Sequence, residues 1–154
     1  MMRAHDNVYS ARLGSHDGKR DSSDGICNMT LQDFYRAYIG CLNRQDWDEL
    51  GRYVADDVKH NARPLGLSGY RSMLIKDFED IPDLRFVIDR LACDPPLIAA
   101  RLMFNCSPKG NFLGLEINGQ RISFAENVFY EVKGGKIADV FSVIDKTSIE
   151  NQIA

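Results

Sequence analysis

The segment from residue 121 to residue 146, RISFAENVFYEVKGGKIADVFSVIDK, constrains the fold more than any other part of the chain. Two runs of strand-forming residues flank Gly134-Gly135, which predicts a β-hairpin with a two-residue turn. Such a turn places Lys133 opposite Lys136 and so fixes the register. Because alternate residues of a strand share a face, one mostly apolar face is predicted to carry the following residues: Ile122, Phe124, Glu126, Val128, Tyr130, Val132, Ile137, Asp139, Phe141, Val143 and Asp145.

Glu126 stands in the middle of this apolar face, opposite Val143 in the predicted register, and Asp145 lies diagonally across at the strand end. Burying an unpaired carboxylate costs several kcal/mol. Glu126 must therefore be paired with a cation, protonated, or open to a solvent-filled pocket. Two interpretations stay open, a structural ion pair on a partly open face and an acid or base of a ligand pocket. Asp145 could also cap the segment that follows it.

Length and charge narrow the class of protein. A chain of 154 residues is long enough for one domain with a real core and too short for two ordinary ones. A net charge of −3 argues against a nucleic-acid partner, which usually binds a basic surface. No apolar run approaches the ~18 residues of a membrane helix, and the polar N-terminus lacks the apolar core of a signal peptide. We therefore expect a cytoplasmic protein that does not contact a membrane.

The four cysteines give no sign of a metal site. They are too far apart for a Cys-X-X-Cys pair, and none has a histidine close to it in the sequence. Cys41, Cys93 and Cys106 lie among apolar residues and are predicted to be small buried side chains rather than metal ligands or disulfide partners.

The chain divides into a tail and one domain. Residues 1–28 are rich in polar residues and glycine, so they are predicted to form a flexible N-terminal tail ahead of a domain over residues 29–154. Three helices are predicted to begin near Thr30, Asp46 and Ser68, where polar or capping residues precede apolar residues at three- and four-residue spacing.

Strands dominate the second half of the chain. Residues 84–93 and 97–106 are runs of strand formers around a turn, and the hairpin follows them. Residues 56–61 are predicted to be a short strand or a loop, and residues 147–153 a helical turn. Helices first and strands afterwards indicate an α+β fold, in which N-terminal helices pack on a strongly curved antiparallel sheet and enclose a pocket.

Such a pocket would be apolar, with a few converging polar groups, as small-molecule sites usually are. The candidate acids and bases are Glu126, Asp145 and His60. The candidate substrate-binding residues are Arg101, Asn105, Tyr38 and Tyr130. If the strand of Arg101 neighbours that of Glu126, the two could pair, which would keep Glu126 ionised; without that partner, burial would raise the carboxyl pKa towards values useful for proton transfer. His60 could be a boundary residue, or it could exchange a proton near neutral pH.

Several short motifs, in their order and spacing, resemble the SnoaL-like polyketide cyclases, also called the ester cyclase group, of the NTF2-like superfamily. The resemblance covers residues 30–152. The matching segments are DVKHN at 57–61, PDL at 82–84, AAR at 99–101, GNFLG at 110–114, NG at 118–119, GGKI at 134–137 and VID at 143–145.

The resemblance implies a cone-shaped α+β barrel with an apolar cavity, and homo-oligomers, here a dimer, that pair through their sheets. It also implies ring closure of a hydrophobic carbonyl compound or ester by acid–base chemistry, without a metal or cofactor. The family's working histidine and acid are replaced here by Pro108 and Ile122. Two alternatives therefore stay open, a non-catalytic domain for small-molecule binding or assembly, and an isomerase or hydrolase on the same fold. GNFLG is expected to be a flap or edge at the pocket mouth.

Overall fold

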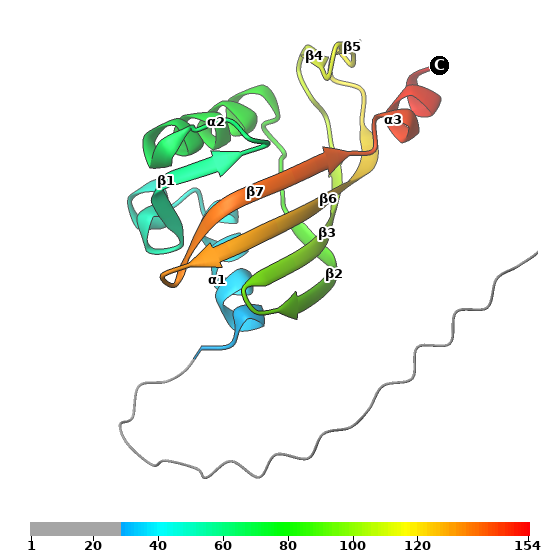
Figure 1. Cartoon of the computed structure of the whole chain (residues 1–154). Helices are drawn as coiled ribbons and strands as arrows, with labels where there is room; N and C mark the ends of the chain where they lie inside the picture. The colour runs from blue at the N-terminus through cyan, green and yellow to red at the C-terminus, as the bar shows by residue number, and fades with distance from the viewer. Residues whose placement is uncertain (1–28) are drawn as a thin grey trace, which may run out of the picture.

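Helices pack against one face of a curved sheet in the computed structural model, which describes residues 29–154 (Figure 1). The tail predicted for residues 1–28, which includes Cys27, lies outside the described residues. The helical elements are α1 (Leu31–Asn43), the 3-10 helix η1 (Trp47–Arg52), α2 (Gly66–Asp80) and α3 (Lys146–Ile153). The strands are β1 (Val54–His60), β2 (Val87–Asp94), β3 (Leu97–Cys106), β4 (Asn111–Phe112), β5 (Leu115–Glu116), β6 (Ile122–Lys133) and β7 (Lys136–Ile144).

The first helix begins where the sequence predicts. The Thr30 side chain caps α1 by accepting a hydrogen bond from the backbone N–H of Asp33 at 3.1 Å. The buried stripe of α1 includes Tyr35, Tyr38 and Leu42, which pack on the concave face of the sheet. The helices and this face together enclose the apolar core, so the α+β prediction is confirmed.

The sheet is mixed rather than purely antiparallel, which corrects the prediction. Its strand order is β1-β7-β6-β3-β2, and β1 runs parallel to β7. The chain between these two strands contains α2 and the whole meander, which is long enough for a parallel connection. Asn61, which directly follows β1, links this edge strand to β7. Its side chain accepts a hydrogen bond from the Ser142 backbone N–H at 2.8 Å and donates one to the Ser142 carbonyl at 3.2 Å. Within residues 29–154, β1 and β2 stay separate edges, so the sheet does not close into the implied barrel.

The hairpin register departs from the prediction after two residue pairs. Lys133 lies opposite Lys136 as predicted, but Glu131 then pairs with Asp139, which leaves Ala138 as one extra residue in β7. A β-bulge of one residue turns every later side chain to the other face. Glu126 therefore lies opposite Ile144 instead of Val143.

The bulge corrects the predicted composition of the apolar face. The β6 residues face inwards as predicted, whereas Phe141 and Val143 point outwards and are 50% and 70% exposed. Val140, Ser142 and Ile144 take the inward positions of β7 instead.

Two further expectations concern cysteines and the membrane. Cys41 and Cys106 are buried as predicted, and Cys93 is half-buried. Within residues 29–154, no helix combines the length and the hydropathy needed to cross a membrane.

Candidate active site

A cavity of about 240 Å³ lies between the helices and the concave face of the sheet. Its wall is mostly apolar and aromatic, with contributions from α1, α2, β3, β6, β7 and the β4–β5 hairpin. The polar or titratable side chains that line it are Tyr38, His60, Tyr70, Asp77, Glu126, Tyr130 and Ser142. None of the lining residues, all of which belong to the described part of the chain, is a lysine or an arginine.

Glu126 lines this cavity from the middle of β6. Its carboxylate accepts a hydrogen bond from the Ser142 hydroxyl, Oγ to Oε1, at 2.8 Å. Burial raises the pKa of the Glu126 carboxyl, and the hydrogen bond from Ser142 opposes part of that rise. Sequence reasoning missed Ser142, because the predicted register placed Phe141 and Val143, rather than Ser142, on the face of Glu126.

Three tyrosines, Tyr38, Tyr70 and Tyr130, line the cavity, and Tyr35 supports one of them from the core. The hydroxyls of Tyr38 and Tyr70 lie 2.7 Å apart, and those of Tyr35 and Tyr130 lie 3.0 Å apart. Burial raises the pKa values of Tyr38, Tyr70 and Tyr130, so these phenols keep their protons at neutral pH. Because two paired hydroxyls use only one of their two protons on each other, the Tyr38–Tyr70 pair has a second O–H to offer a ligand oxygen.

Asp77 is the site residue that sequence reasoning missed and could have found. It lines the cavity from α2, and burial and then the negative charge of Glu126 raise the pKa of its carboxyl to about 7. In the sequence it follows Tyr70 by seven residues and Leu74 by three, so it falls on the apolar stripe of the helix. An acid among apolar residues on one face of a helix is comparable to the acid among apolar residues on one face of a strand that identified Glu126 as a candidate.

His60 lines the cavity from the end of β1. Its backbone exchanges two hydrogen bonds with Arg63, and its ring centroid lies 6.2 Å from that of Tyr70. Burial and then the charge of Arg63 lower the pKa of the His60 imidazole, so this ring is mainly neutral at pH 7. A neutral imidazole can accept or pass on a proton but supplies no positive charge to the cavity.

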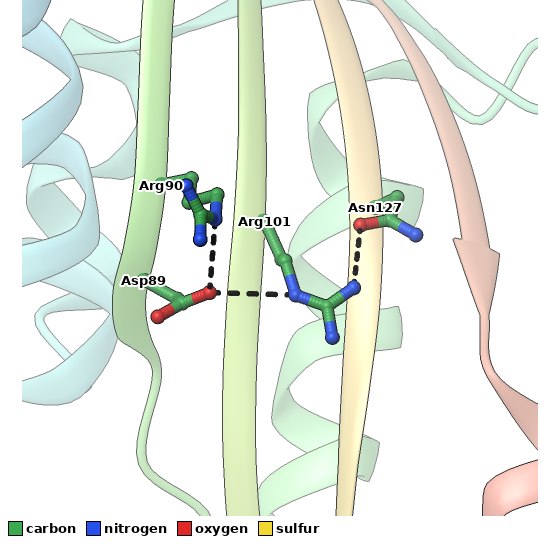
Figure 2. A network of polar contacts seen from close by, with 4 residues as sticks. All are labelled: Asp89, Arg90, Arg101 and Asn127. Atoms are coloured by element: carbon green, nitrogen blue, oxygen red, sulfur yellow. Dashed lines mark hydrogen bonds and ion pairs between the residues drawn. The ribbon is translucent and has the colours of Figure 1, made fainter.

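Arg101 lies on the outer face of the sheet, away from Glu126. Leu102, not Arg101, is the direct partner of Glu126 between β3 and β6, and neighbouring residues of a strand point to opposite faces. The Arg101 guanidinium instead contacts Asp89 Oδ2 at 3.4 Å and Asn127 Oδ1 at 3.5 Å, across three neighbouring strands (Figure 2). The strands of Arg101 and Glu126 are therefore neighbours, which was the condition for a pair between the two side chains, but the Arg101–Glu126 pair does not form.

Two other candidates also lie outside the cavity. Asn105 is exposed on the same face of β3 as Arg101. Asp145 caps α3, where its Oδ1 accepts from the backbone N–H of Ser148 at 3.1 Å, as its alternative role predicted. The structure thus brings together Glu126, His60, Tyr38 and Tyr130 and separates them from Arg101, Asn105 and Asp145.

The β4–β5 hairpin forms one edge of the cavity. It projects beyond the end of the main sheet near α3, and its residues Phe112 and Leu113 line the cavity (Figure 1). Leu113 has a positive φ of 53° and is 40% exposed, so the tip lies between the cavity and solvent. This is the position predicted for the GNFLG segment.

Comparisons with known proteins agree with this fold and cavity. The family model described as SnoaL-like polyketide cyclase matches residues 32–153. A crystal structure of a SnoaL-like polyketide cyclase from Agrobacterium tumefaciens str. C58 is 54% identical, with a TM-score of 0.80, and the match covers 81% of this chain and 98% of that one.

Two more distant structures show the same fold. TsrD from Streptomyces laurentii is 19% identical with a TM-score of 0.71 (84% of this chain, 98% of that one). Wild-type IdmH from Streptomyces antibioticus is 16% identical with a TM-score of 0.68 (79% of this chain, 96% of that one). No curated protein matches the sequence significantly. The fold is NTF2-like, and the chain belongs to the SnoaL-like polyketide cyclase family.

Proposed function

We propose that this chain is a cofactor-independent enzyme that transfers protons on a small, neutral, hydrophobic carbonyl compound, with Glu126 as the base. The observation that carries the proposal is the Glu126 carboxylate in an apolar cavity, held by the Ser142 hydroxyl and free of a lysine or arginine partner within residues 29–154. Burial raises the pKa of such a carboxyl and makes it a stronger base than an exposed one.

The tyrosine pair supplies the second part of the chemistry. When Glu126 removes a proton from the carbon next to a carbonyl, negative charge develops on the carbonyl oxygen. The free O–H of the Tyr38–Tyr70 pair is a buried donor that can hydrogen-bond this oxygen and stabilise the charge. The resulting enolate, or the enol that forms when its oxygen takes a proton, can attack a second carbonyl of the same molecule, which is the ring closure that membership of the cyclase family supports.

The cavity favours a small substrate. Its volume of about 240 Å³ lies below the roughly 300–1,000 Å³ of sites for drug-sized ligands. Its aromatic wall suits one or two rings, and the Glu126 carboxylate repels an anionic substrate. A closed Arg101–Glu126 pair would have favoured the non-catalytic alternative, but Arg101 bonds Asp89 instead.

The first prediction is that the wild-type protein exchanges the α-hydrogens of small bicyclic ketones. We expect β-tetralone in heavy water to exchange at least tenfold faster with the protein than in matched buffer, because the cavity combines a base with an oxygen-binding donor. Proton NMR measures the loss of the α-hydrogen signal. Absence of exchange across a panel of neutral ketones would contradict the proposed reaction.

We also propose that two copies of the chain pair through the outer faces of their sheets. On this face the cross-strand pair Phe129 and Phe141 is 58% and 50% exposed, and Val143 beside it is 70% exposed. Exposed apolar side chains gathered on one face mark an interaction surface. A second copy is the occupant favoured by the resemblance to family members that pair through their sheets.

The second prediction tests this pairing. Phe129→Asp should weaken self-association at least about thirtyfold, because it places a charge at the centre of an apolar contact. Sedimentation velocity over a range of concentrations measures the change. Met29→Asp, at an exposed apolar residue outside the sheet, should self-associate as the wild type does. A wild-type protein that stays monomeric throughout would refute the pairing.

A further inference from the structure

The cavity holds two carboxyl groups that face it from opposite layers of the fold. Glu126 lines it from the sheet, and Asp77 lines it from α2. The two groups differ in their hydrogen bonds. Glu126 accepts the Ser142 hydroxyl at 2.8 Å, whereas no donor within residues 29–154 bonds the Asp77 carboxyl. A hydrogen bond from a neutral donor stabilises a carboxylate more than a carboxylic acid, so this difference favours ionisation of Glu126 over Asp77.

The other charged and titratable groups around Asp77 do not cancel this difference. On its own helix, Lys76 contacts Asp80 at 3.1 Å. The charge of Asp80 raises the pKa of Asp77 and the charge of Lys76 lowers it, so these two neighbours oppose each other. The remaining titratable groups that line the cavity are uncharged at neutral pH: Tyr38 from α1, Tyr70 from α2, His60 from β1 and Tyr130 from β6. Of the lining residues, only Glu126 can therefore place a full charge near Asp77.

We propose that Asp77 is the proton donor of this cavity and Glu126 its proton acceptor, an inference that rests on the function proposed above. Two carboxyls in one poorly solvated cavity do not ionise together, because the first negative charge opposes the second. The pKa of Asp77, raised to about 7 by burial and by the charge of Glu126, agrees with this assignment. When the environments of two carboxyl groups give them different pKa values, the group with the higher pKa can act as the acid and the other as the base.

The assignment gives a balanced reaction without a further reactant. The Glu126 carboxylate takes a proton from the carbon next to the carbonyl, and the C–H electron pair becomes the new C=C bond. The π electrons of the carbonyl move to its oxygen, which takes the proton of Asp77, so that a neutral enol forms. When the enol carbon then bonds to a second carbonyl carbon, the first oxygen returns its proton to Asp77 and Glu126 protonates the second oxygen. Both carboxyls end as they began.

A titration of the free protein tests the proton assignment without any substrate. Carbon NMR of carboxyl-labelled protein should show Asp77 titrating near pH 7 and Glu126 at lower pH. Glu126→Gln should lower the Asp77 midpoint, because it removes the opposing negative charge. Glu79→Gln, at an exposed acid of the same helix, should leave the midpoint almost unchanged. An Asp77 midpoint close to the usual ~3.9 of an aspartate would overturn the proposal.

Ketone exchange distinguishes this inference from the function on which it rests. In the wild type the rate should fall above about pH 7, as Asp77 loses its proton. Asp77→Asn should lower the rate by a factor of roughly 10²–10⁴ and remove that alkaline fall. If Glu126→Gln is inactive while Asp77→Asn keeps the full rate and the alkaline fall, the role of Asp77 is refuted and that of Glu126 stands. If Glu126→Gln stays active, the proposed function fails; if no ketone exchanges, the titration alone decides the Asp77 assignment.

Discussion

Glu126→Gln should lower the α-hydrogen exchange rate of β-tetralone by a factor of roughly 10²–10⁴, the usual contribution of a positioned general base. The glutamine keeps the volume of the side chain and its hydrogen bond with Ser142, but it cannot accept a proton at neutral pH. The free energy of unfolding should change by no more than ~1 kcal/mol, because the packing is conserved and a buried carboxylate is removed. Proton NMR gives the rate, and urea unfolding gives the stability.

The matched control for this variant is Glu131→Gln. Glu131 lies on the same strand, is partly exposed, and contacts Lys133 outside the cavity. We expect this control to keep the wild-type exchange rate, because it alters charge without touching the site. Equal loss of activity in both variants would mean that net charge, and not the position of the base, controls the reaction.

The second large effect concerns stability. The free energy of unfolding should fall by up to ~4 kcal/mol as the pH rises from about 4 to about 7, and then level off. The sign follows from the pKa of Asp77, which is about 7 in the folded protein against a reference value of 3.8. Between these values the folded state binds more protons than the unfolded state, so stability is greatest at the acidic end of this range and is lost towards neutral pH. The raised pKa of Glu126 acts in the same direction.

Urea unfolding at several pH values measures this effect. Asp77→Asn should remove most of the slope and should be more stable than the wild type at pH 8, because it no longer has to ionise in a poorly solvated cavity. Glu79→Gln should keep the wild-type slope, since Glu79 is an exposed acid of the same helix. A slope that survives in Asp77→Asn would show that another group carries the pH dependence.

The parts of the fold that the sequence predicted are those set by local signals. Thr30 caps α1 as predicted, and β3 covers the predicted run of residues 97–106. The inward face of β6 follows from strict alternation, which requires no knowledge of the partner strand. The placement of Glu126 in the cavity was predictable for the same reason.

The parts that could not be predicted depend on contacts between distant segments. No glycine at or beside Ala138 signals the bulge in the sequence. The bulge nevertheless determines that Ser142, and not Val143, faces the cavity. The parallel pairing of β1 with β7 joins segments separated by most of the domain. Arg101 alternates correctly along its own strand, but its separation from Glu126 depends on the register between β3 and β6.

The extra residue in β7 has a consequence for how such a protein can vary. Removing Ala138 would restore simple alternation and turn the rest of the strand over in one step. The Ser142 hydroxyl would then point away from the Glu126 carboxylate that it hydrogen-bonds. The phenyl ring of Phe141 would point into the cavity and would be absent from the outer surface. The proposed active site and the proposed pairing of two copies therefore depend on the same strand, so a change of register in β7 would alter both of them at once.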